Sequence, residues 1–276
     1  MIVNLIFAAA KILGGLIGNA YVLIADGIES ALDIAGSLVI WGGLKFAARP
    51  PDETHPYGHG KAEPIAAVIV AFGVLAAALG LAIESIREIR TPHHGPAPFT
   101  LGILIVVIAV KETLFRYVNR IGRNVKSTAV QTDAWHHRSD ALTSAAAFIG
   151  ISVALIGGKG WESADDWAAL FACGVIAANG VRLLQPALFE IMDAAPRGEV
   201  VDRVRHAAAA VPGVIEVEKS FVRKMGLSFY VDLHVRVNER ITVREGHDIA
   251  HEVKRAIQQT DARIADVLVH IEPADS

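Results

Sequence analysis

Six long apolar segments constrain this chain more than any other feature of its sequence. A helix needs about 20 mostly apolar residues to cross a bilayer. With 53% hydrophobic residues and a mean hydropathy of +0.41, the 276-residue chain is more apolar than an ordinary soluble protein. The sequence therefore predicts an all-α transmembrane domain with six helices. The expected spans are Ile2–Ile24, Ile28–Ala48, Pro64–Ile86, Phe99–Val118, Thr128–Ile156 and Asp166–Ile191.

The basic residues predict how these spans are oriented. Loops rich in Lys and Arg stay on the cytoplasmic side of a membrane. Such a loop follows the fourth span, and with six spans both termini then lie in the cytoplasm of a multi-pass inner (plasma) membrane protein surrounded by lipid. Arg87 and Arg90 oppose this orientation but are outnumbered. The basic residues of the loop are Arg116, Arg120, Arg123 and Lys126.

Composition also excludes two classes of function. The net charge is only −3, so there is no general basic field for nucleic acid, and no nucleic-acid partner is expected. The single cysteine, Cys173, excludes an internal disulfide and any cysteine-based zinc knuckle. Because it lies in an apolar run, we expect Cys173 to be a small packing residue.

The character of the chain changes after Met192, which divides it into a membrane domain, residues 1–192, and a tail, residues 193–276. The tail predicts the order α-β-β-α-β, which gives a small two-layer α+β domain. Its second strand alternates cleanly, with Val231, Leu233 and Val235 on one face. The expected elements are helix Glu199–Val211, strands Val214–Lys224 and Leu227–Asn238, helix Thr242–Gln259 and strand Arg263–Ile271.

Two of the apolar segments carry acidic residues and a histidine at helical spacing. Residues four apart stack on one face of a helix, and ionisable side chains inside spans are costly and usually functional. Two such faces predict a tetrahedral site for Zn²⁺ or a similar ion; the alternative is that these residues cap helices or lie among headgroups. The candidate ligands are Glu29 and Asp33 on the second span and His136 and Asp140 on the fifth. Asp26 and Asp133, one turn before each pair, are expected to have accessory roles.

Two further clusters lie outside the spans. Asp52, His55 and His59 share a short loop that Pro and Gly bend, so they can hold a metal ion, unless the loop is simply polar. The tail carries a second set, for which scattered surface histidines are the alternative. Its members are His234, His247, His251, His270, Glu218 and Glu272. The charged residues Lys11, Lys111 and Glu112 are expected to pair with other spans, and Lys61 with Asp193.

The loop His-Pro-Tyr-Gly-His-Gly-Lys-Ala-Glu ending at Glu63, the His136-x3-Asp140 motif and the tail together resemble the cation diffusion facilitator family. That family comprises divalent metal/proton antiporters, among them bacterial zinc and ferrous-iron efflux proteins. The resemblance implies a transport site formed by Glu29, Asp33, His136 and Asp140, a loop site formed by Asp52, His55 and His59, and a binuclear tail site formed by His234, His247, His270 and Glu272. Glu29 departs from the Asp, His or Asn usual in the family, and a longer carboxylate could tolerate Mn²⁺ or Fe²⁺ alongside Zn²⁺.

The resemblance also implies a function. It predicts efflux of a divalent metal, Zn²⁺ first, with Fe²⁺, Mn²⁺, Co²⁺ or Cd²⁺ as further candidates, in exchange for protons by alternating access. It implies a homodimer whose cytoplasmic tails meet and have a metallochaperone-like, ferredoxin-like fold. No hydrolase motif is present, so no enzyme activity is expected. The alternative function is a non-transporting membrane metal sensor or scaffold that uses the cytoplasmic sites.

Overall fold

The fold is described from a computed structural model, which covers residues 2–90, 95–124, 128–158, 160–161, 163–196 and 199–274; side chains are described for these residues except 2–3 and 121–139. The chain divides into two compact units. The first joins Met1–Val39 with Ile69–Leu184 and is here called the helical unit. The second joins Ile40–Val68 with Gln185–Ser276 and is called the sheet unit.

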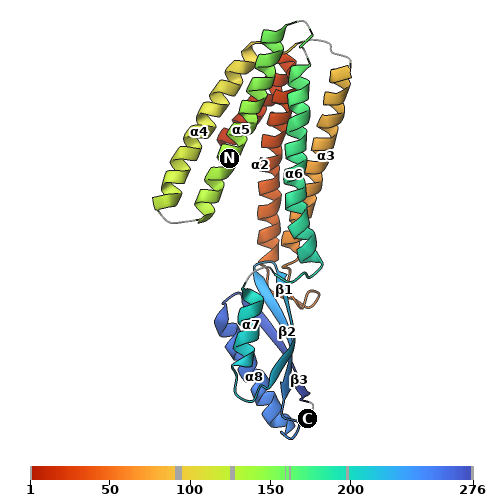
Figure 1. Ribbon diagram of the computed structural model, residues 1–276, viewed down its shortest axis with the longest axis vertical. Helices are drawn as coiled ribbons and strands as arrows, with labels where there is room; N and C mark the ends of the chain where they lie inside the picture. The colour runs from red at the N-terminus through yellow and green to blue at the C-terminus, as the bar shows by residue number, and fades with distance from the viewer. Residues whose placement is uncertain are drawn as a thin grey trace. The chain divides into compact units, whose positions relative to one another are not determined.

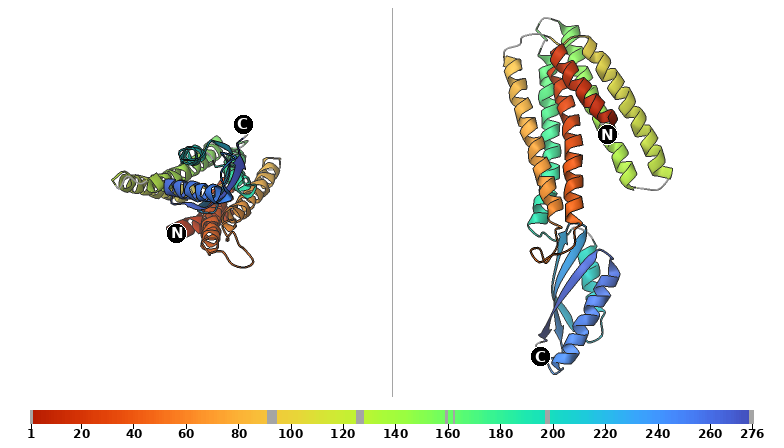
Figure 2. Two further views of the ribbon diagram at one scale, coloured as in Figure 1. Left: turned by 90° about the horizontal axis from the view of Figure 1, so that it is seen from below. Right: turned by 180° about the vertical axis from the view of Figure 1, so that it is seen from behind.

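Within the described ranges, six long helices precede the sheet, in the order that the apolar segments predicted (Figures 1 and 2). Among the described residues, α3, the Asp140–Gly157 part of α5, and α6 are long and apolar enough to cross a membrane, and Asn4–Gly18 is a shorter apolar helix. Cys173 is buried within α6, as expected of a packing residue. The helices are α1 Ile2–Gly18, α2 Tyr21–Ala47, α3 Ala62–Arg90, α4 Phe99–Asn124, α5 Thr128–Gly157 and α6 Ala164–Ile191.

The break between the first two helices lies earlier than the sequence predicted. The expected span Ile2–Ile24 was wrong at its C-terminal end, because α1 ends at Gly18 and α2 begins at Tyr21. Asn19 takes a φ of 50°, the left-handed conformation that Asn tolerates at helix ends. The early break places Asp26 within α2, one turn before Glu29.

The tail forms the predicted α-β-β-α-β arrangement. Its sheet has the order β1-β2-β3, in which β2 is antiparallel to β1 and parallel to β3. The alternation predicted for β2 is present, since Val231, Leu233 and Val235 are each at most 1% exposed. They form one core with side chains of α7 and α8, so the two helices cover one face of the sheet. The elements are α7 Val200–Ala209, β1 Glu216–Met225, β2 Ser228–Val237, α8 Val243–Thr260 and β3 Ile264–Pro273.

The start of α8 is fixed by a capping box. The hydroxyl of Thr242 accepts a hydrogen bond from the backbone N–H of Glu245, and the Glu245 carboxylate accepts one from the backbone N–H of Thr242. Both contacts satisfy N–H groups that the first helical turn leaves without partners. The pKa of Glu245 is lowered, first by the backbone N–H of Thr242 and second by the Thr242 hydroxyl, which also donates to the Glu245 carboxylate.

Candidate metal sites

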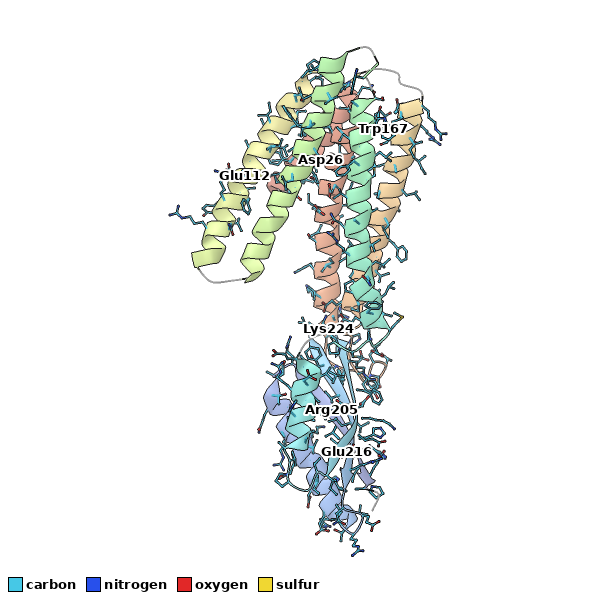
Figure 3. All side chains as sticks on the ribbon, in the orientation of Figure 1. Asp26, Glu112, Trp167, Arg205, Glu216 and Lys224 are labelled. Carbon is cyan, nitrogen blue, oxygen red and sulfur yellow. The ribbon has the colours of Figure 1, made fainter. Side chains whose placement is uncertain are left out.

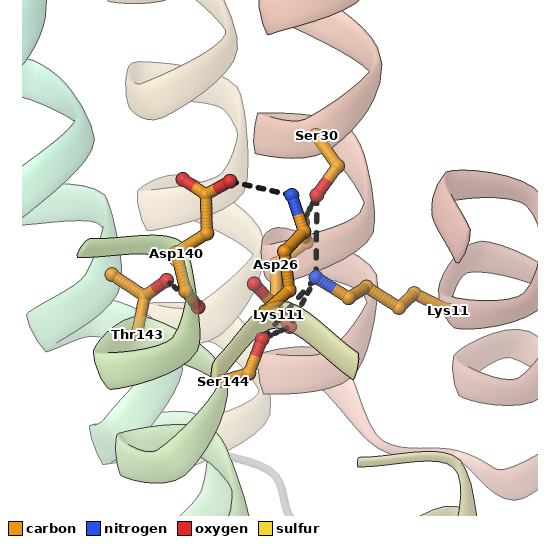
Figure 4. Close-up of polar contacts among 7 residues, drawn as sticks. All are labelled: Lys11, Asp26, Ser30, Lys111, Asp140, Thr143 and Ser144. Atoms are coloured by element: carbon orange, nitrogen blue, oxygen red, sulfur yellow. Dashed lines mark hydrogen bonds and ion pairs between the residues drawn. The ribbon is translucent and has the colours of Figure 1, made fainter. Parts of the chain in front are cut away.

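Helices α2 and α5 meet at a buried polar contact in the helical unit. Ser144 Oγ on α5 donates a 2.7 Å hydrogen bond to Asp26 Oδ2 on α2. Lys11 Nζ on α1 lies 2.8 Å from the same oxygen and 3.2 Å from both Ser30 Oγ and Ser144 Oγ. Figure 3 labels Asp26 in this unit, and Figure 4 shows the contacts. Asp26, expected to have an accessory role, is thus held by a buried ion pair joining three helices.

The contact between Asp26 and Ser144 shows which parts of α2 and α5 lie side by side, and therefore where the candidate ligands lie. Helices α2 and α5 run in opposite directions (Figure 1), so residues after Asp26 lie beside residues before Ser144. Glu29 follows Asp26 by three positions and Asp140 precedes Ser144 by four, which is about one helical turn in each case. In agreement, Glu29 interacts electrostatically with Asp140 and Asp33. The packing of α2 on α5 therefore brings these carboxylates to one region.

The carboxylates of this region are not in ligand geometry with one another. Among the described residues, Glu29, Asp33 and Asp140 do not form a group whose ligand atoms all lie within 4.8 Å. The side chain of His136, the fourth predicted ligand, lies outside the described residues, as does that of Asp133. Asp140 Oδ2 instead lies 2.6 Å from Lys111 Nζ on α4.

The loop before α3 gathers the second predicted set. Asp52 Oδ1 lies 3.2 Å from His55 Nδ1, and Asp52 Oδ2 lies 3.3 Å from His59 Nε2. The two imidazole rings are 4.4 Å apart between centroids. One ligand atom from each residue lies within 4.8 Å of the others, so a modest closure would bring all three to a single ion.

Local hydrogen bonds stabilise the negative charge of Asp52 in this loop. Asp52 Oδ1 accepts hydrogen bonds from the Thr54 hydroxyl and from the backbone N–H groups of Thr54 and His55. The Thr54 hydroxyl bond and then the His55 backbone bond lower the pKa of Asp52 to about 2, so this carboxylate is ionised at neutral pH. His59 is 9% exposed, and its Nδ1 has no hydrogen-bond partner within the described part of the chain. The other ring nitrogen, Nε2, faces Asp52 and is the one placed to bind a metal with it.

The loop also packs against the β1–β2 hairpin, within the sheet unit. A Cβ added at Gly60 would lie 2.7 Å from the backbone C and O atoms of Met225, so only glycine fits this approach without a shift. Lys61 Nζ lies 2.5 Å from Asp193 Oδ1, as predicted, and donates to the carbonyl of Glu190 at the end of α6. Lys61 thus adds a second donor to a carbonyl that also accepts from the backbone N–H of Asp193.

A further ion pair joins α6 to the hairpin. Glu190 accepts hydrogen bonds from Lys224 Nζ at 2.8 Å and from the backbone N–H of Gly226; Figure 3 labels Lys224. Burial lowers the pKa of Lys224, but the hydrogen bond and charge of Glu190 outweigh it, so the pKa is raised. Lys224 therefore stays charged and holds the hairpin to the end of α6.

The tail set is brought together on the sheet face opposite the helices. His234 on β2 is the register partner of His270 on β3, and Glu272 lies two positions further along β3. Glu272 Oε1 lies 2.6 Å from His234 Nδ1 and 3.5 Å from His270 Nε2. Its pKa is lowered, first by a hydrogen bond with Glu218 and second by His234. These three residues offer ligand atoms within 4.8 Å of one another.

The fourth predicted tail ligand lies elsewhere in the single chain. His247 is on α8, where its ring centroid is 4.4 Å from that of His251. Because α8 packs on the other face of the sheet, His247 does not join His234, His270 and Glu272 within one chain. Its role as a ligand of that site stays a prediction that requires a second subunit.

Comparison with known families agrees with this architecture. The family model described as "Cation efflux transmembrane domain" matches residues 1–192, and that described as "Cation efflux protein, cytoplasmic domain" matches residues 196–274. The chain belongs to the cation diffusion facilitator family. It is therefore an integral membrane protein that transports divalent metal cations out of a compartment, as members of the cation diffusion facilitator family do, and it is not an enzyme.

Individual members of the cation diffusion facilitator family align along nearly the whole chain. The manganese efflux system protein MneP of Bacillus subtilis is 30% identical, covering 99% of this chain and 93% of that protein. The magnetosome protein MamB of Magnetospira sp. is 32% identical, covering 95% and 88% respectively. Among solved structures, a MamM CTD is 29% identical and covers 28% of this chain and 93% of that chain, with a TM-score of 0.27.

Sequence reasoning missed the partners of the two buried lysines. Lys11 and Lys111 were expected to pair with other spans and do so, with Asp26 and Asp140. Glu112 was expected to do the same, but it pairs with Arg116 on its own helix at 2.8 Å, the i, i+4 geometry of a surface ion pair. These partners depend on how each helix is rotated about its own axis. The sequence of a uniformly apolar span does not reveal that rotation.

Proposed function

We propose that this protein exports a divalent cation from the cytoplasm in exchange for protons, with the cargo held by Glu29, Asp33, His136 and Asp140. The observation that carries the proposal is the packing of α2 on α5 through Asp26 and Ser144, which supports a shared site one turn away. Metal ligands must lose protons to bind and regain them on release, which links metal flux to proton flux.

The donor set favours manganese as the cargo. Three carboxylates and one imidazole form an oxygen-rich site. Carboxylate oxygens are ligands that suit Mn²⁺, whereas the sites typical of Zn²⁺ are richer in nitrogen and sulfur. The Bacillus subtilis relatives MneP and MneS are named as manganese efflux proteins and are each 30% identical over 99% and 98% of this chain. Zn²⁺, the first expectation from the sequence, and Fe²⁺, Co²⁺ and Cd²⁺ are the competing cargoes.

The remaining parts of the proposal concern placement and assembly. The predicted basic loop was wrong at its start, because Arg116, Arg120 and Arg123 lie in the C-terminal part of α4. These basic residues still support an inner (plasma) membrane location with both termini in the cytoplasm. The family model for the second domain, named ZT_dimer, supports a homodimer joined through the tail. The loop cluster around Asp52 and the tail cluster around Glu272 would then bind cytoplasmic metal and regulate transport.

The test is metal uptake into proteoliposomes with an imposed pH gradient. Wild type is expected to transport Mn²⁺ at the highest kcat/KM among Mn²⁺, Zn²⁺, Fe²⁺, Co²⁺ and Cd²⁺, and to move protons in the opposite direction. Asp33→Ala and Asp140→Ala are each expected to lower kcat/KM at least about 100-fold, since losing one ligand or its supporting partner costs that much in metal sites.

Ser37→Ala is the matched control, because Ser37 lies one turn beyond Asp33 and donates only to the Asp33 backbone carbonyl. It should retain wild-type transport. Undiminished flux in both aspartate variants would refute the site. Metal binding without any flux in wild type would favour the sensor or scaffold instead.

A further inference from the structure

Lys111 places a fixed positive charge on one of the proposed cargo ligands. It lies in the middle of α4, is 2% exposed, and its Nζ is 2.6 Å from Asp140 Oδ2. Figure 4 shows this side chain reaching from α4 to the carboxylate on α5. A buried ammonium group is costly unless it is paired, and Asp140 supplies that pairing.

The second buried lysine shows that this arrangement is not a general need of the fold. Lys11 is 0% exposed and has three acceptors, namely Asp26, Ser30 and Ser144. Within the described residues, Lys111 has the single acceptor Asp140. An ammonium group has three donors. Among the described residues, all the acceptors of Lys11 surround its ammonium group, whereas Lys111, which has a flexible side chain, is held by one carboxylate.

Lys111 and a cargo ion would be two positive charges on the same carboxylate. A metal ion bound to Asp140 would lie about 2.0–2.2 Å from the carboxylate oxygen, and Lys111 Nζ now lies 2.6 Å from that oxygen. A divalent ion and an ammonium group at such a separation repel strongly in a medium of low dielectric constant. Even if the ion uses the other oxygen of Asp140, the two positive charges oppose each other, so cargo binding favours movement of Lys111 away from Asp140.

We propose that Lys111 is a tethered competitor of the cargo: its ammonium group binds Asp140 when the transport site is empty and is displaced when a divalent cation enters. This inference rests on the proposed function and adds to it a residue that sets cargo affinity. By returning to Asp140, Lys111 weakens metal binding and speeds release. Lys111 is a positioning residue, since it acts on the cargo through Asp140 and does not ligate it.

The test is the split between KM and kcat for Mn²⁺ transport by the full-length protein in proteoliposomes. Lys111→Met and Lys111→Gln remove the competing charge, and each is expected to lower KM by about 5- to 150-fold, the usual range of coupling between two binding events, and to lower kcat because release slows. Lys111→Arg keeps the charge and is expected to restore a KM near that of wild type.

Direct Mn²⁺ binding should report the same change. Measured on a His55→Ala/His234→Ala background that weakens the loop and tail sites, Kd should fall in Lys111→Met by a factor similar to that for KM. Arg116→Gln is the matched control, because it removes a positive charge from the same helix that pairs with Glu112 at the surface. It should leave KM and Kd unchanged.

The outcomes separate this inference from the proposed function. Wild-type transport together with an unchanged or raised KM in both neutral Lys111 variants would overturn the tethered competitor and leave the transport site standing. An equal fall of KM in Arg116→Gln would also overturn it, because the effect of removing a positive charge from α4 would then be general. Absence of Mn²⁺ flux and binding in wild type would remove the proposed function and this inference together.

Discussion

At the scale of single residues, the carboxylate of Asp26 receives an ammonium group from α1 and a hydroxyl group from α5. Lys11, Asp26 and Ser144 are all buried, and the Lys11–Asp26 distance is 2.8 Å. Breaking a buried ion pair by removing one partner is far more harmful than replacing both, because the remaining charge is left unpaired. Asp26 therefore belongs to the framework that positions Glu29 and Asp140.

The first prediction at this scale concerns Asp26→Asn. The substitution keeps the shape of the side chain but leaves Lys11 buried without an anion, so we expect stability to fall by about 3–5 kcal/mol. The thermal unfolding midpoint of the purified protein measures this. The double variant Lys11→Met/Asp26→Leu, which removes both charges, should recover most of the loss. A double variant as unstable as Asp26→Asn would show that the charge pair is not the cause.

At the scale of elements, α8 is held by a cap at its first turn and by packing on the sheet along its length. Its capping box pairs Thr242 with Glu245, and its buried residues Val253 and Ile257 pack on the sheet. A cap satisfies N–H groups that packing cannot reach. The position of His247, which lies in the next turn, follows from where the cap starts the helix.

Thr242→Ala is expected to destabilise α8 by about 1 kcal/mol, the usual effect of losing a Thr N-cap. Hydrogen exchange of α8 amides in the full-length protein measures this. Because the pKa of Glu245 is lowered in the folded protein, its contribution is complete above the ordinary value of 4.5 and is lost as the pH falls through the lowered pKa. The difference between wild type and variant should therefore be full at pH 7 and shrink below pH 4.5.

Thr260→Ala provides the comparison at the other end of the same helix. The Thr260 hydroxyl donates to the Ile257 carbonyl and caps no N–H group. Its removal should change exchange only in the last turn. Equal losses in the two variants, or a Thr242→Ala effect independent of pH, would contradict the role assigned to the capping box.

At the scale of the whole molecule, the compact units do not follow the order of the chain. The sheet unit takes in Ile40–Val68 together with Gln185–Ser276, so the Asp52 loop and the end of α6 belong with the β1–β2 hairpin. Gly60, Lys61 and Lys224 make the contacts that hold them. A cation bound in the loop would therefore act on the same body as one bound on the sheet.

Gly60→Ala tests this union. The added Cβ would lie 2.6 Å from Met225 Cγ and 2.7 Å from the Met225 backbone, so the loop or the hairpin must shift, at a cost of about 1–3 kcal/mol. We expect faster hydrogen exchange in β1 and β2 and weaker metal binding at Asp52. Gly42→Ala, where nothing lies within 4 Å of the added Cβ, should leave both unchanged. Wild-type exchange rates in Gly60→Ala would argue against the packing of the Asp52 loop on the β1–β2 hairpin.

The parts of this architecture that sequence predicts are those with local causes. The alternation of Val231, Leu233 and Val235 predicts the buried face of β2, and the short spacing of Asp52, His55 and His59 predicts their cluster. Long-range pairs such as Lys111 with Asp140 depend on how each helix is rotated, which an apolar span does not reveal. The end of α1 was missed because Asn19, rather than glycine, adopts the left-handed turn. The ligand roles themselves stay predictions.

The two internal lysines also bear on the electrical behaviour of the resting protein. Lys11 and Lys111 hold their positive charges 2.8 Å and 2.6 Å from the acidic oxygens of Asp26 and Asp140. Charged side chains inside membrane-spanning helices are costly unless they are paired. Because each countercharge belongs to the chain's own helices, the two pairs are electrically balanced before any ion from solution has bound.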